Sequence, residues 1–314
     1  MGDVVRSGFG GRCRRGGPCP RRPRAWLRGI TAAIAAGAGL LGALAGSAAA
    51  EAAPSQATAS TVVHAPRIPI NGFGVQATWS STNWSGYAKV GTFAGVNSTW
   101  TVPAVAASAS PTFSSAWIGV DGYANSSLIQ TGTEQDYYNG AAHYAAWWEI
   151  LPAPETALPT SDPVIPGDRM KASIYETSTV SGPVHGHRVA HLWVVTISDT
   201  SRGWSYSTRQ SYSGPGASAE WIVEAPQVNG AVSTLAHYTV TPPAGTGDFD
   251  NAGDLTSPVA SGSPAYVNAG LNYLKDAGVM AQNGVQVSTP SDPDGALTAF
   301  NAAYGSALPA APTG

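Results

Sequence analysis

Residues 219–224 read Ala-Glu-Trp-Ile-Val-Glu, and this stretch decides what kind of fold the chain can adopt. Successive side chains of a β-strand point to opposite faces, so Glu220 and Glu224 would share one face. Trp221 and Val223 would point to the other face. Such a strand packs a hydrophobic core on one side and offers carboxylates to a cleft on the other.

Short stretches of the same kind recur along the chain, separated by turn dipeptides such as Asp121-Gly122, Asn139-Gly140 and Asn283-Gly284. We predict strands at about 83–88, 97–102, 115–120, 127–131, 144–151, 168–176, 190–199, 202–212, 219–223 and 235–241, with a late hairpin over 279–288. Only 267–277 could form a short helix, and no element is predicted between Pro242 and Pro264. This spacing predicts an all-β fold of two antiparallel sheets packed as a β-sandwich.

The N-terminus has the features of a secretory signal peptide. Residues 1–29 carry eight arginines, an apolar run follows over 30–44, and small residues fill 45–50. The apolar run is shorter than the roughly 20 residues that a membrane span needs, so a membrane anchor is the weaker alternative. We therefore predict a signal peptide over 1–50 and a secreted, extracellular protein without a membrane partner after cleavage.

Both cysteines, Cys13 and Cys19, fall within this signal peptide, so the exported protein is expected to lack disulfides. Residues 51–78 are rich in Ala, Ser, Thr and Pro and are predicted to be a pro-segment or disordered linker. One sandwich domain is predicted over 79–305, followed by a disordered tail over 306–314.

The charge of the exported part limits the partners that it could have. From Pro54 onward there are 8 basic and 17 acidic residues, a net charge of −9. An acidic protein is a poor ligand for nucleic acid or for an anionic membrane. Nothing in the sequence indicates an oligomer, and a monomer is the default expectation.

Several common catalytic motifs are missing from the sequence. It contains no G-x-S-x-G, no H-E-x-x-H, no Walker loop and no D-T-G, and the exported part has no cysteine nucleophile.

Five other segments stand out, and they are Asn83–Tyr87, Ala116–Gly122, Leu128–Gly132, Ala146–Pro152 and Ala219–Glu224. In order and content these segments resemble the glutamic peptidases, also called eqolisins. The resemblance covers residues 79–241 and becomes fainter as far as Tyr304.

The resemblance implies a bent, jelly-roll or concanavalin-like β-sandwich with a substrate cleft across its concave sheet. It also implies that Gln130 and Glu224 are the catalytic pair of an acid endopeptidase that pepstatin does not inhibit. Glu224 would act as general base on a water molecule, and Gln130 would donate its amide N–H to the developing oxyanion. A carboxamide does not ionise, which suits work in acid. The substrates would be polypeptides, and no cofactor or metal is implied.

Further residues of the site are carried over from the resemblance. The substrate-cleft or supporting residues are expected to be Trp84, Trp117, Asp121, Glu134, Trp147, Glu149 and Glu220. The tryptophans could equally belong to the core. Glu220 is the rival of Glu224 for the role of base, because both lie on the same face of one strand. Residues 145–151 lack the Asp and Tyr found in fungal members, which leaves the subsite preference open.

Two other chemistries have to be weighed. His185, His187 and His191 could bind zinc or copper, but neighbouring glycines and a proline favour a solvated group beside a turn. A β-sandwich glycoside hydrolase would need two carboxyl groups about 5–5.5 Å apart. Glu220 and Glu224 would be roughly 13 Å apart on one strand. Glu149 with Glu224 remains possible, as does a non-catalytic carbohydrate-binding module.

Overall fold

The computed structural model describes residues 61–71, 77–181 and 190–313. Strands dominate these residues, and the only helix in the described ranges is the four-residue α1 (Tyr273–Asp276). The strands are β1 (Val62–Val63), β2 (Trp79–Ser81), β3 (Trp84–Val90), β4 (Gly95–Thr101), β5 (Ala104–Val105), β6 (Ser115–Val120), β7 (Ile129–Tyr138), β8 (Ala141–Ile150), β9 (Thr156–Ala157), β10 (Arg169–Ser181), β11 (Ala190–Asp199), β12 (Trp204–Tyr212), β13 (Ser218–Glu224), β14 (Gln227–Val228), β15 (Ala231–Val232), β16 (Tyr238–Thr239), β17 (Phe249–Leu255), β18 (Val267–Asn268), β19 (Ala277–Gln282), β20 (Val285–Pro290) and β21 (Ala302–Tyr304). The predicted signal peptide lies outside the described residues.

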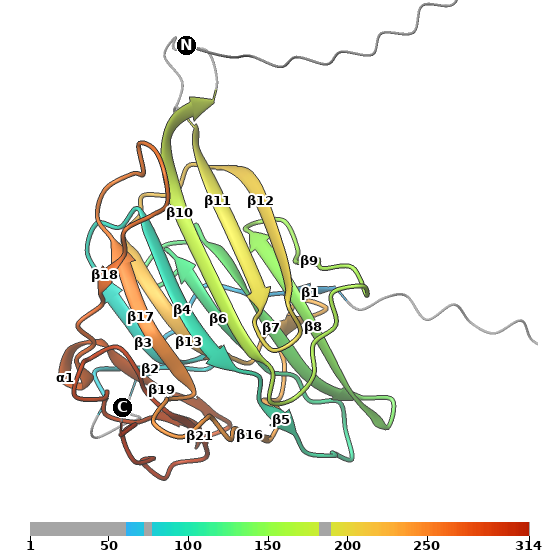
Figure 1. The fold of residues 1–314 in the computed structure, drawn as a ribbon. Coiled ribbons are helices and arrows are strands. Elements are labelled where there is room, and N and C mark those ends of the chain that lie inside the picture. The colour runs from blue at the N-terminus through green and yellow to red at the C-terminus, as the bar shows by residue number, and fades with distance from the viewer. Residues whose placement is uncertain (1–60, 72–76, 182–189, 314) are drawn as a thin grey trace, which may run out of the picture. The chain divides into compact units, whose positions relative to one another are not determined.

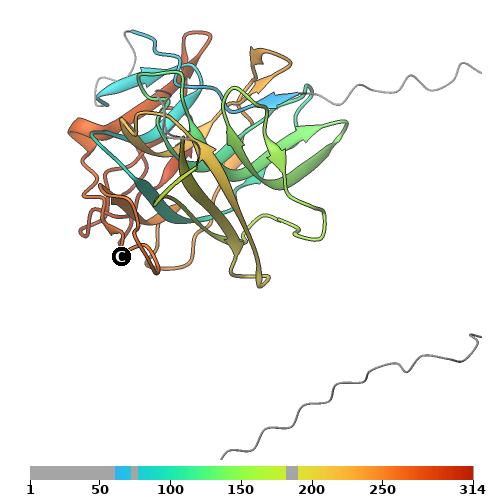
Figure 2. The same ribbon diagram turned by 90° about the horizontal axis from the view of Figure 1, so that it is seen from above.

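Two large sheets make up the fold. The first has the order β21-β20-β19-β3-β13-β6-β7-β8-β9, with β2 attached in parallel to β19. The second has the order β12-β11-β10-β4-β17-β18. Figure 1 shows the second sheet in front of β6, β13 and β7, and Figure 2 shows the same strands from above. The predicted all-β sandwich of two antiparallel sheets is therefore confirmed. Two small sheets, β1-β14-β15 and β16-β5, complete the chain.

The main core lies between the two large sheets. Trp221 and Val223 of β13 belong to this core, as the alternation in the sequence predicts. The indole N–H of Trp221 also donates to the carbonyl oxygen of Asn97 in the other sheet at 3.0 Å. Burying an indole requires a partner for its polar N–H, and this hydrogen bond across the core provides one.

A second apolar cluster covers the opposite face of the first sheet. Its fully buried members include Trp84, Trp117, Trp147, Leu128 and Ile222. Trp84 and Trp117 meet edge to face, with ring centroids 5.0 Å apart. The tryptophans predicted to line a cleft thus lie away from the main core.

Gly132 of β7 allows the close packing of this cluster. A Cβ atom added at Gly132 would lie 2.4 Å from the Cβ atom of Trp117 on the neighbouring strand β6. Real Cβ atoms do not approach so closely, so the position requires a residue without a side chain.

Three differences from the predicted elements have local causes. The strand β17 is missing from the prediction because its sequence contains Asp, Asn and Gly. Its pairing with β4 shifts register between Asp250 and Gly253, where Asn251 has a φ of 53°. The strand predicted over 235–241 is reduced to β16, and only α1 remains of the possible helix.

The predicted pro-segment or linker and the predicted tail both contact the sandwich in the described residues. Within the predicted pro-segment or linker, β1 pairs with β14 and Pro69 forms a bridge with Ser81. In the tail, Asn301 donates to the carbonyl oxygen of Ala310 at 2.7 Å. Residues 61–71 and the tail thus both make hydrogen bonds with the sandwich. No helix long and apolar enough to cross a membrane occurs in the described residues.

Candidate active site

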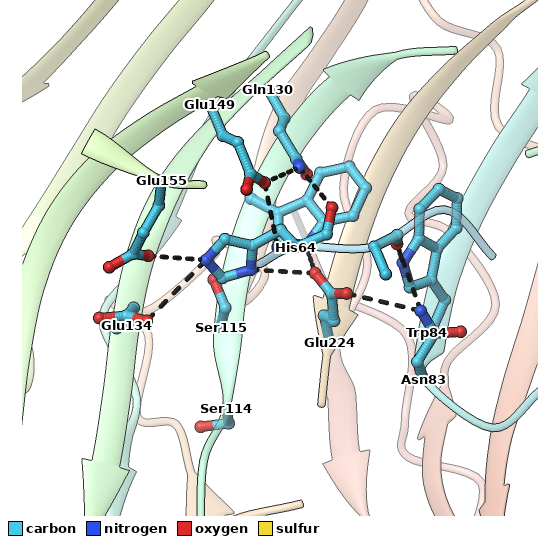
Figure 3. A network of polar contacts seen from close by, with 12 residues as sticks. His64, Asn83, Trp84, Ser114, Ser115, Gln130, Glu134, Glu149, Glu155 and Glu224 are labelled. Atoms are coloured by element: carbon cyan, nitrogen blue, oxygen red, sulfur yellow. Dashed lines mark hydrogen bonds and ion pairs between the residues drawn. The ribbon is translucent and has the colours of Figure 1, made fainter. Parts of the chain in front are cut away.

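Polar side chains gather on the face of the first sheet that carries the tryptophan cluster. Gln130 of β7 lies opposite Glu149 of β8 in the strand pairing. Glu224 of β13 lies opposite Ser115 of β6, which in turn lies opposite Glu134 of β7. All four residues with titratable or amide side chains are buried in the cluster that Figure 3 shows.

His64 occupies the centre of this cluster (Figure 3). Its Nδ1 atom lies 3.1 Å from Oε2 of Glu224, and its Nε2 atom lies 3.0 Å from Oε2 of Glu155. The imidazole ring stacks on the ring of Trp147 with centroids 3.6 Å apart and an interplanar angle of 4°. The side chain is completely buried. A residue from the N-terminal segment thus fills the middle of the candidate site.

The backbone of His64 is bound as closely as its ring. Its N–H donates to Oε2 of Glu149 at 3.0 Å, and its carbonyl oxygen accepts from Nε2 of Gln130 at 2.7 Å. The same Nε2 atom donates to Oε2 of Glu149 at 2.6 Å. Gln130 and Glu224 are therefore brought together around one residue, and His64 connects them.

Besides His64, two side chains contact the carboxyl group of Glu224. The indole N–H of Trp117 donates to Oε2 of Glu224 at 2.8 Å, and Nδ2 of Asn83 lies 3.5 Å from Oε1. Asn83 also accepts from the N–H of Ile68 at 2.8 Å through its Oδ1 atom. Unlike His64, these two donors cannot ionise in the pH range of an enzyme.

The acid groups of the site are shifted toward their neutral forms. Burial raises the pKa of Glu149 to about 8, an increase that the nearby His64 reduces. Burial also raises the pKa of Glu224, against the effect of its hydrogen bonds with His64 and Trp117. The pKa of Glu134 lies well above its usual range because of burial and the nearby Asp136.

His64 itself is shifted toward its charged form. Burial by itself would lower its pKa, but hydrogen bonds with Glu155 and Glu224 and the charges of Glu224 and Glu149 raise the pKa well above its usual range. An imidazolium among four carboxyl groups is the expected result, since opposite charges favour each other in a site of low polarity. Glu134, 3.9 Å from Nε2, is the fourth of these groups.

Two predicted site residues lie apart from this cluster. Asp121 accepts from the hydroxyl of Tyr212 at 2.7 Å and from the N–H groups of Gly216 and Ala217 at 2.9 and 2.7 Å. It therefore fastens the loop between β12 and β13. Glu220 shares the face of Glu224, as predicted, but both of its carboxyl oxygens are buried without a hydrogen-bond partner in the described residues.

The prediction from sequence did not include three residues that take part in the site. His64 lies in the segment assigned to a pro-segment or linker, although the β-branched pair Val62-Val63 before it is typical of a strand. Glu155 follows the tryptophan segment in a loop. Asn83 stands in one of the five matching segments but was not assigned a role.

The structure also bears on possible metal sites. Ligand atoms of His64, Glu134 and Glu155 lie within 4.8 Å of one another. The hydrogen bond between His64 and Glu155 explains this proximity without an ion. In the histidine cluster weighed as a zinc or copper site, His185 and His187 lie outside the described residues, and His191 contacts Glu176.

Comparison with known proteins agrees with the geometry. The sequence pattern of the Peptidase A4 family matches residues 82–253, which include the candidate pair but not His64. Aspergillopepsin-2 of Aspergillus niger is 26% identical over 231 residues, which cover 65% of this chain and 74% of that protein. A crystal structure of Scytalido-glutamic peptidase with a peptide-based transition-state analogue has a TM-score of 0.52 at 20% identity, covering 71% of this chain and 98% of the other.

Proposed function

The chain belongs to the peptidase A4 family and is a glutamic endopeptidase, and from this premise we propose that Glu224 and Gln130 are its catalytic pair. The observation that carries the proposal concerns His64. Its backbone carbonyl oxygen accepts from Nε2 of Gln130 at 2.7 Å, and its ring Nδ1 atom lies 3.1 Å from Oε2 of Glu224. A polypeptide bound in this way would have a backbone carbonyl oxygen at Gln130 and the side chain of the same residue at Glu224.

Glu224 acts as the general base in the proposed reaction. As a carboxylate it takes a proton from water, and the resulting hydroxide adds to the carbonyl carbon of the peptide bond. When the carbon–nitrogen bond breaks, Glu224 returns the proton to the departing amine. Hydrogen bonds with His64 and Trp117 favour the carboxylate form, so they partly offset the effect of burial on its pKa.

Gln130 stabilises the oxyanion that forms on the carbonyl oxygen. Its amide N–H already points at such an oxygen, which is the geometry that this role requires. Glu149 fixes the amide by accepting from the same nitrogen at 2.6 Å. Glu149 is therefore a positioning residue, whose contact with the reacting carbonyl passes through Gln130.

The substrates are polypeptides, and the groups that would bind them recognise main chain. Gln130, Glu149 and the indole N–H of Trp84 all contact backbone atoms of the segment in the site. Recognition of backbone groups, which every polypeptide has, suits an enzyme that cuts unfolded proteins. We propose that this enzyme acts outside the cell in acid, after removal of a signal peptide within residues 1–50.

The experiment that tests the catalytic pair is cleavage of casein between pH 2 and 7. Wild type, Glu224→Gln and Gln130→Ala are compared, with pepstatin and EDTA in parallel samples. We expect cleavage in acid that neither inhibitor affects. Glu224→Gln should abolish it, and Gln130→Ala should lower the rate by about 100- to 1,000-fold, the usual loss for one oxyanion donor.

Thermal unfolding of each variant shows that the loss of activity is not a loss of fold. If Glu224→Gln keeps the wild-type rate, the assignment of the base is wrong. Inhibition by EDTA would contradict a mechanism without a metal. The carbohydrate alternatives have no specific support in the structure, and cleavage of casein that depends on both residues would exclude them.

A further inference from the structure

A pair of aromatic rings lies beside the candidate active site and has no part in the proposed reaction. Tyr123, in the loop that follows β6, and Trp79 of β2 meet edge to face. Their ring centroids are 5.7 Å apart, with an interplanar angle of 76°. Trp79 is buried and Tyr123 is partly buried, so part of this pair remains accessible to a ligand.

The guanidinium of Arg67 lies against both rings. Its Cζ atom is 4.2 Å from the ring centroid of Tyr123 and 5.7 Å from that of Trp79. Its Nε atom donates to the carbonyl oxygen of Tyr123 at 3.0 Å. A cation within about 6 Å of an aromatic centroid is attracted by the negative charge on the ring face. The two rings and the carbonyl oxygen thus form a site that fits a guanidinium.

Contacts that do not involve Arg67 hold both rings in place. The Nδ2 atom of Asn125 donates to Oδ1 of Asp121 at 3.0 Å, which closes the loop that carries Tyr123. The indole N–H of Trp79 donates to the carbonyl oxygen of Asp276 at 2.8 Å. A site that is formed in advance loses less freedom when it binds, so more of the contact energy remains for affinity.

The same loop forms one side of a pocket of about 300 Å³. Residues 122–126 line this side, and Pro66, Arg67 and Pro69 line the other. The second side belongs to the N-terminal segment that passes through the candidate active site. A polypeptide that followed the path of this segment would therefore meet the same loop and the same two rings.

The position of Arg67 in this segment relates the rings to the catalytic pair. The proposed mechanism cuts after the residue whose carbonyl oxygen accepts from Gln130, and His64 holds that place here. Arg67 is the third residue after His64. Its N–H donates to the carbonyl oxygen of Gly122 at 3.0 Å, which fixes the main chain at this step. Main-chain contacts thus define the spacing between the bond that is cut and the rings.

We propose that Tyr123 and Trp79 form a specificity site that selects polypeptides with arginine as the third residue after the bond that is cut. The proposal rests on the proposed catalytic pair, because that pair defines the bond. Arginine fits better than lysine, since its planar group can lie against a ring while Nε donates to the carbonyl oxygen. Arginine is charged at every pH at which an enzyme works, so the preference holds in acid.

The test uses peptides of the sequence Ala-Ala-Phe-Ala-Ala-X-Ala between a fluorophore and a quencher, where X is arginine, lysine, citrulline or alanine. The phenylalanine ring can stack on Trp147 as the imidazole of His64 does. Rates are measured with the full chain at pH 4, and mass spectrometry of the fragments identifies the bond that is cut. We expect cleavage after phenylalanine, with kcat/KM about 2- to 30-fold higher for arginine than for alanine.

The other two peptides separate the rings from simpler causes. Citrulline has the shape of arginine without its charge, so its kcat/KM should lie nearer to that for alanine. Lysine should fall between arginine and alanine, because it has the charge but not the planar group. Equal values for arginine and citrulline would show that the charge has no part. Equal values for arginine and lysine would indicate attraction to the acidic protein as a whole, and either result overturns the proposal.

Variants of Tyr123 locate the preference in the structure. Tyr123→Leu removes the ring, so the ratio of kcat/KM for arginine to that for alanine should fall toward one. Tyr123→Phe keeps the ring and should keep the ratio. Tyr206→Leu changes a tyrosine of β12, in the other sheet, and is the matched control that should also keep it. A wild-type ratio in Tyr123→Leu would contradict the role of the ring.

Casein in parallel samples distinguishes this proposal from the proposed function. If casein is cut but arginine brings no advantage over alanine, or the arginine peptide is not cut after phenylalanine, the specificity proposal is overturned and the catalytic pair is unaffected. If a folded wild type cuts neither casein nor any of the peptides, the proposed function itself fails. Thermal unfolding of each variant shows whether it is folded.

Discussion

At the scale of single residues, the structure separates two glutamates that the sequence leaves equivalent. Glu220 and Glu224 lie on one face of β13. Of the two, only Glu224 contacts His64, the residue of the N-terminal segment that fills the middle of the site. The carboxyl group of Glu220 is fully buried, and burial raises its pKa well above its usual range. Burial raises the pKa of Glu224 as well, but there the hydrogen bonds with His64 and Trp117 oppose the shift, so Glu224 is the better base of the two.

We accordingly predict that Glu220→Gln cuts casein at close to the wild-type rate at pH 4. The change replaces a neutral carboxyl group by a neutral amide of nearly the same shape, so little should alter in the cleft. The matched variant Glu224→Gln, four residues away on the same strand, should be inactive. Steady-state rates for the two variants check this. Loss of activity in Glu220→Gln alone would move the base to Glu220.

Glu149 gives a second prediction at this scale. Its pKa is raised to about 8 by burial, so it is neutral in acid and holds Gln130 through an oxygen that a glutamine would also offer. Glu149→Gln should thus keep most of the activity at pH 4. Glu149→Leu removes the acceptor, and the loss of about 1–3 kcal/mol should lower kcat by roughly 5- to 150-fold.

Comparison of kcat and KM for these two variants distinguishes positioning from packing. A positioning role predicts that glutamine rescues kcat and that leucine lowers kcat more than it raises KM. Equal losses in Glu149→Gln and Glu149→Leu at pH 4 would show that the charge of Glu149 is needed, contrary to the role assigned here.

At the scale of strands, the structure depends on close approach between β6 and β7. Gly132 lies against Trp117, whose indole N–H donates to Glu224. We predict that Gly132→Ala destabilises the protein by about 1–3 kcal/mol, the usual effect of overpacking, and also lowers activity by displacing the indole. Gly295→Ala is the matched control, because nothing lies within 4 Å of an added Cβ at that position.

Urea unfolding and casein cleavage of the two glycine variants provide the measurement. Gly295→Ala should stay within about 0.5 kcal/mol of wild type, as surface substitutions usually do. If Gly132→Ala matched the control in both stability and rate, the close contact with Trp117 would have no part in shaping the site.

How far the sequence predicts the strands depends on whether the signal is local. The alternation in residues 219–224 correctly predicts which side chains of β13 face the core, because a strand has a period of two. The central strand β17 escapes prediction since its pairing with β4 contains a bulge at Asn251. That pairing joins parts of the chain that are more than 140 residues apart, so no local pattern records it.

The same distinction applies to the candidate site. Gln130 and Glu224 can be named from sequence because their segments match a family. The place of His64 cannot, because it follows from contacts with Glu155, Trp147 and Glu224, all more than 80 residues away. The composition of residues 51–78 indicates little internal structure, and the described part, 61–71, takes its place from contacts with the rest of the fold.

At the scale of the whole molecule, the buried acid groups determine how stability depends on pH. Burial raises the pKa of Asp136 to about 7 and that of Asp248 to about 6, in addition to the shift of Glu149 to about 8. Each group prefers its protonated form when the protein is folded. The stabilisation of the folded state that each group contributes is therefore complete below its pKa in the unfolded chain, near 4. It is lost as the pH rises through the pKa of the group in the folded protein. Burial alone would lower the pKa of His64, but its hydrogen bonds with Glu155 and Glu224 raise it. His64 therefore also stabilises the folded protein less as the pH rises.

We predict that the melting temperature falls by several degrees or more between about pH 4.5 and pH 8. The measurement is thermal unfolding of Glu224→Gln, which should not digest its unfolded copies, in buffers of constant ionic strength. The opposite trend is usual for proteins whose carboxylates are stabilised by ion pairs. A melting temperature that rises toward pH 8 would contradict the shifts described for Asp136, Asp248 and Glu149.

The burial of these carboxyl groups also has a consequence for where such a molecule can persist. A copy that diffuses out of an acidified zone into neutral surroundings ionises its buried groups one after another, and each ionisation favours the unfolded chain. Unfolded copies are themselves polypeptides, and neighbours that are still folded can digest them. The reach of the enzyme around its source would then be set by the local gradient of protons, and stray molecules would be removed at the edge of that gradient without an external inhibitor.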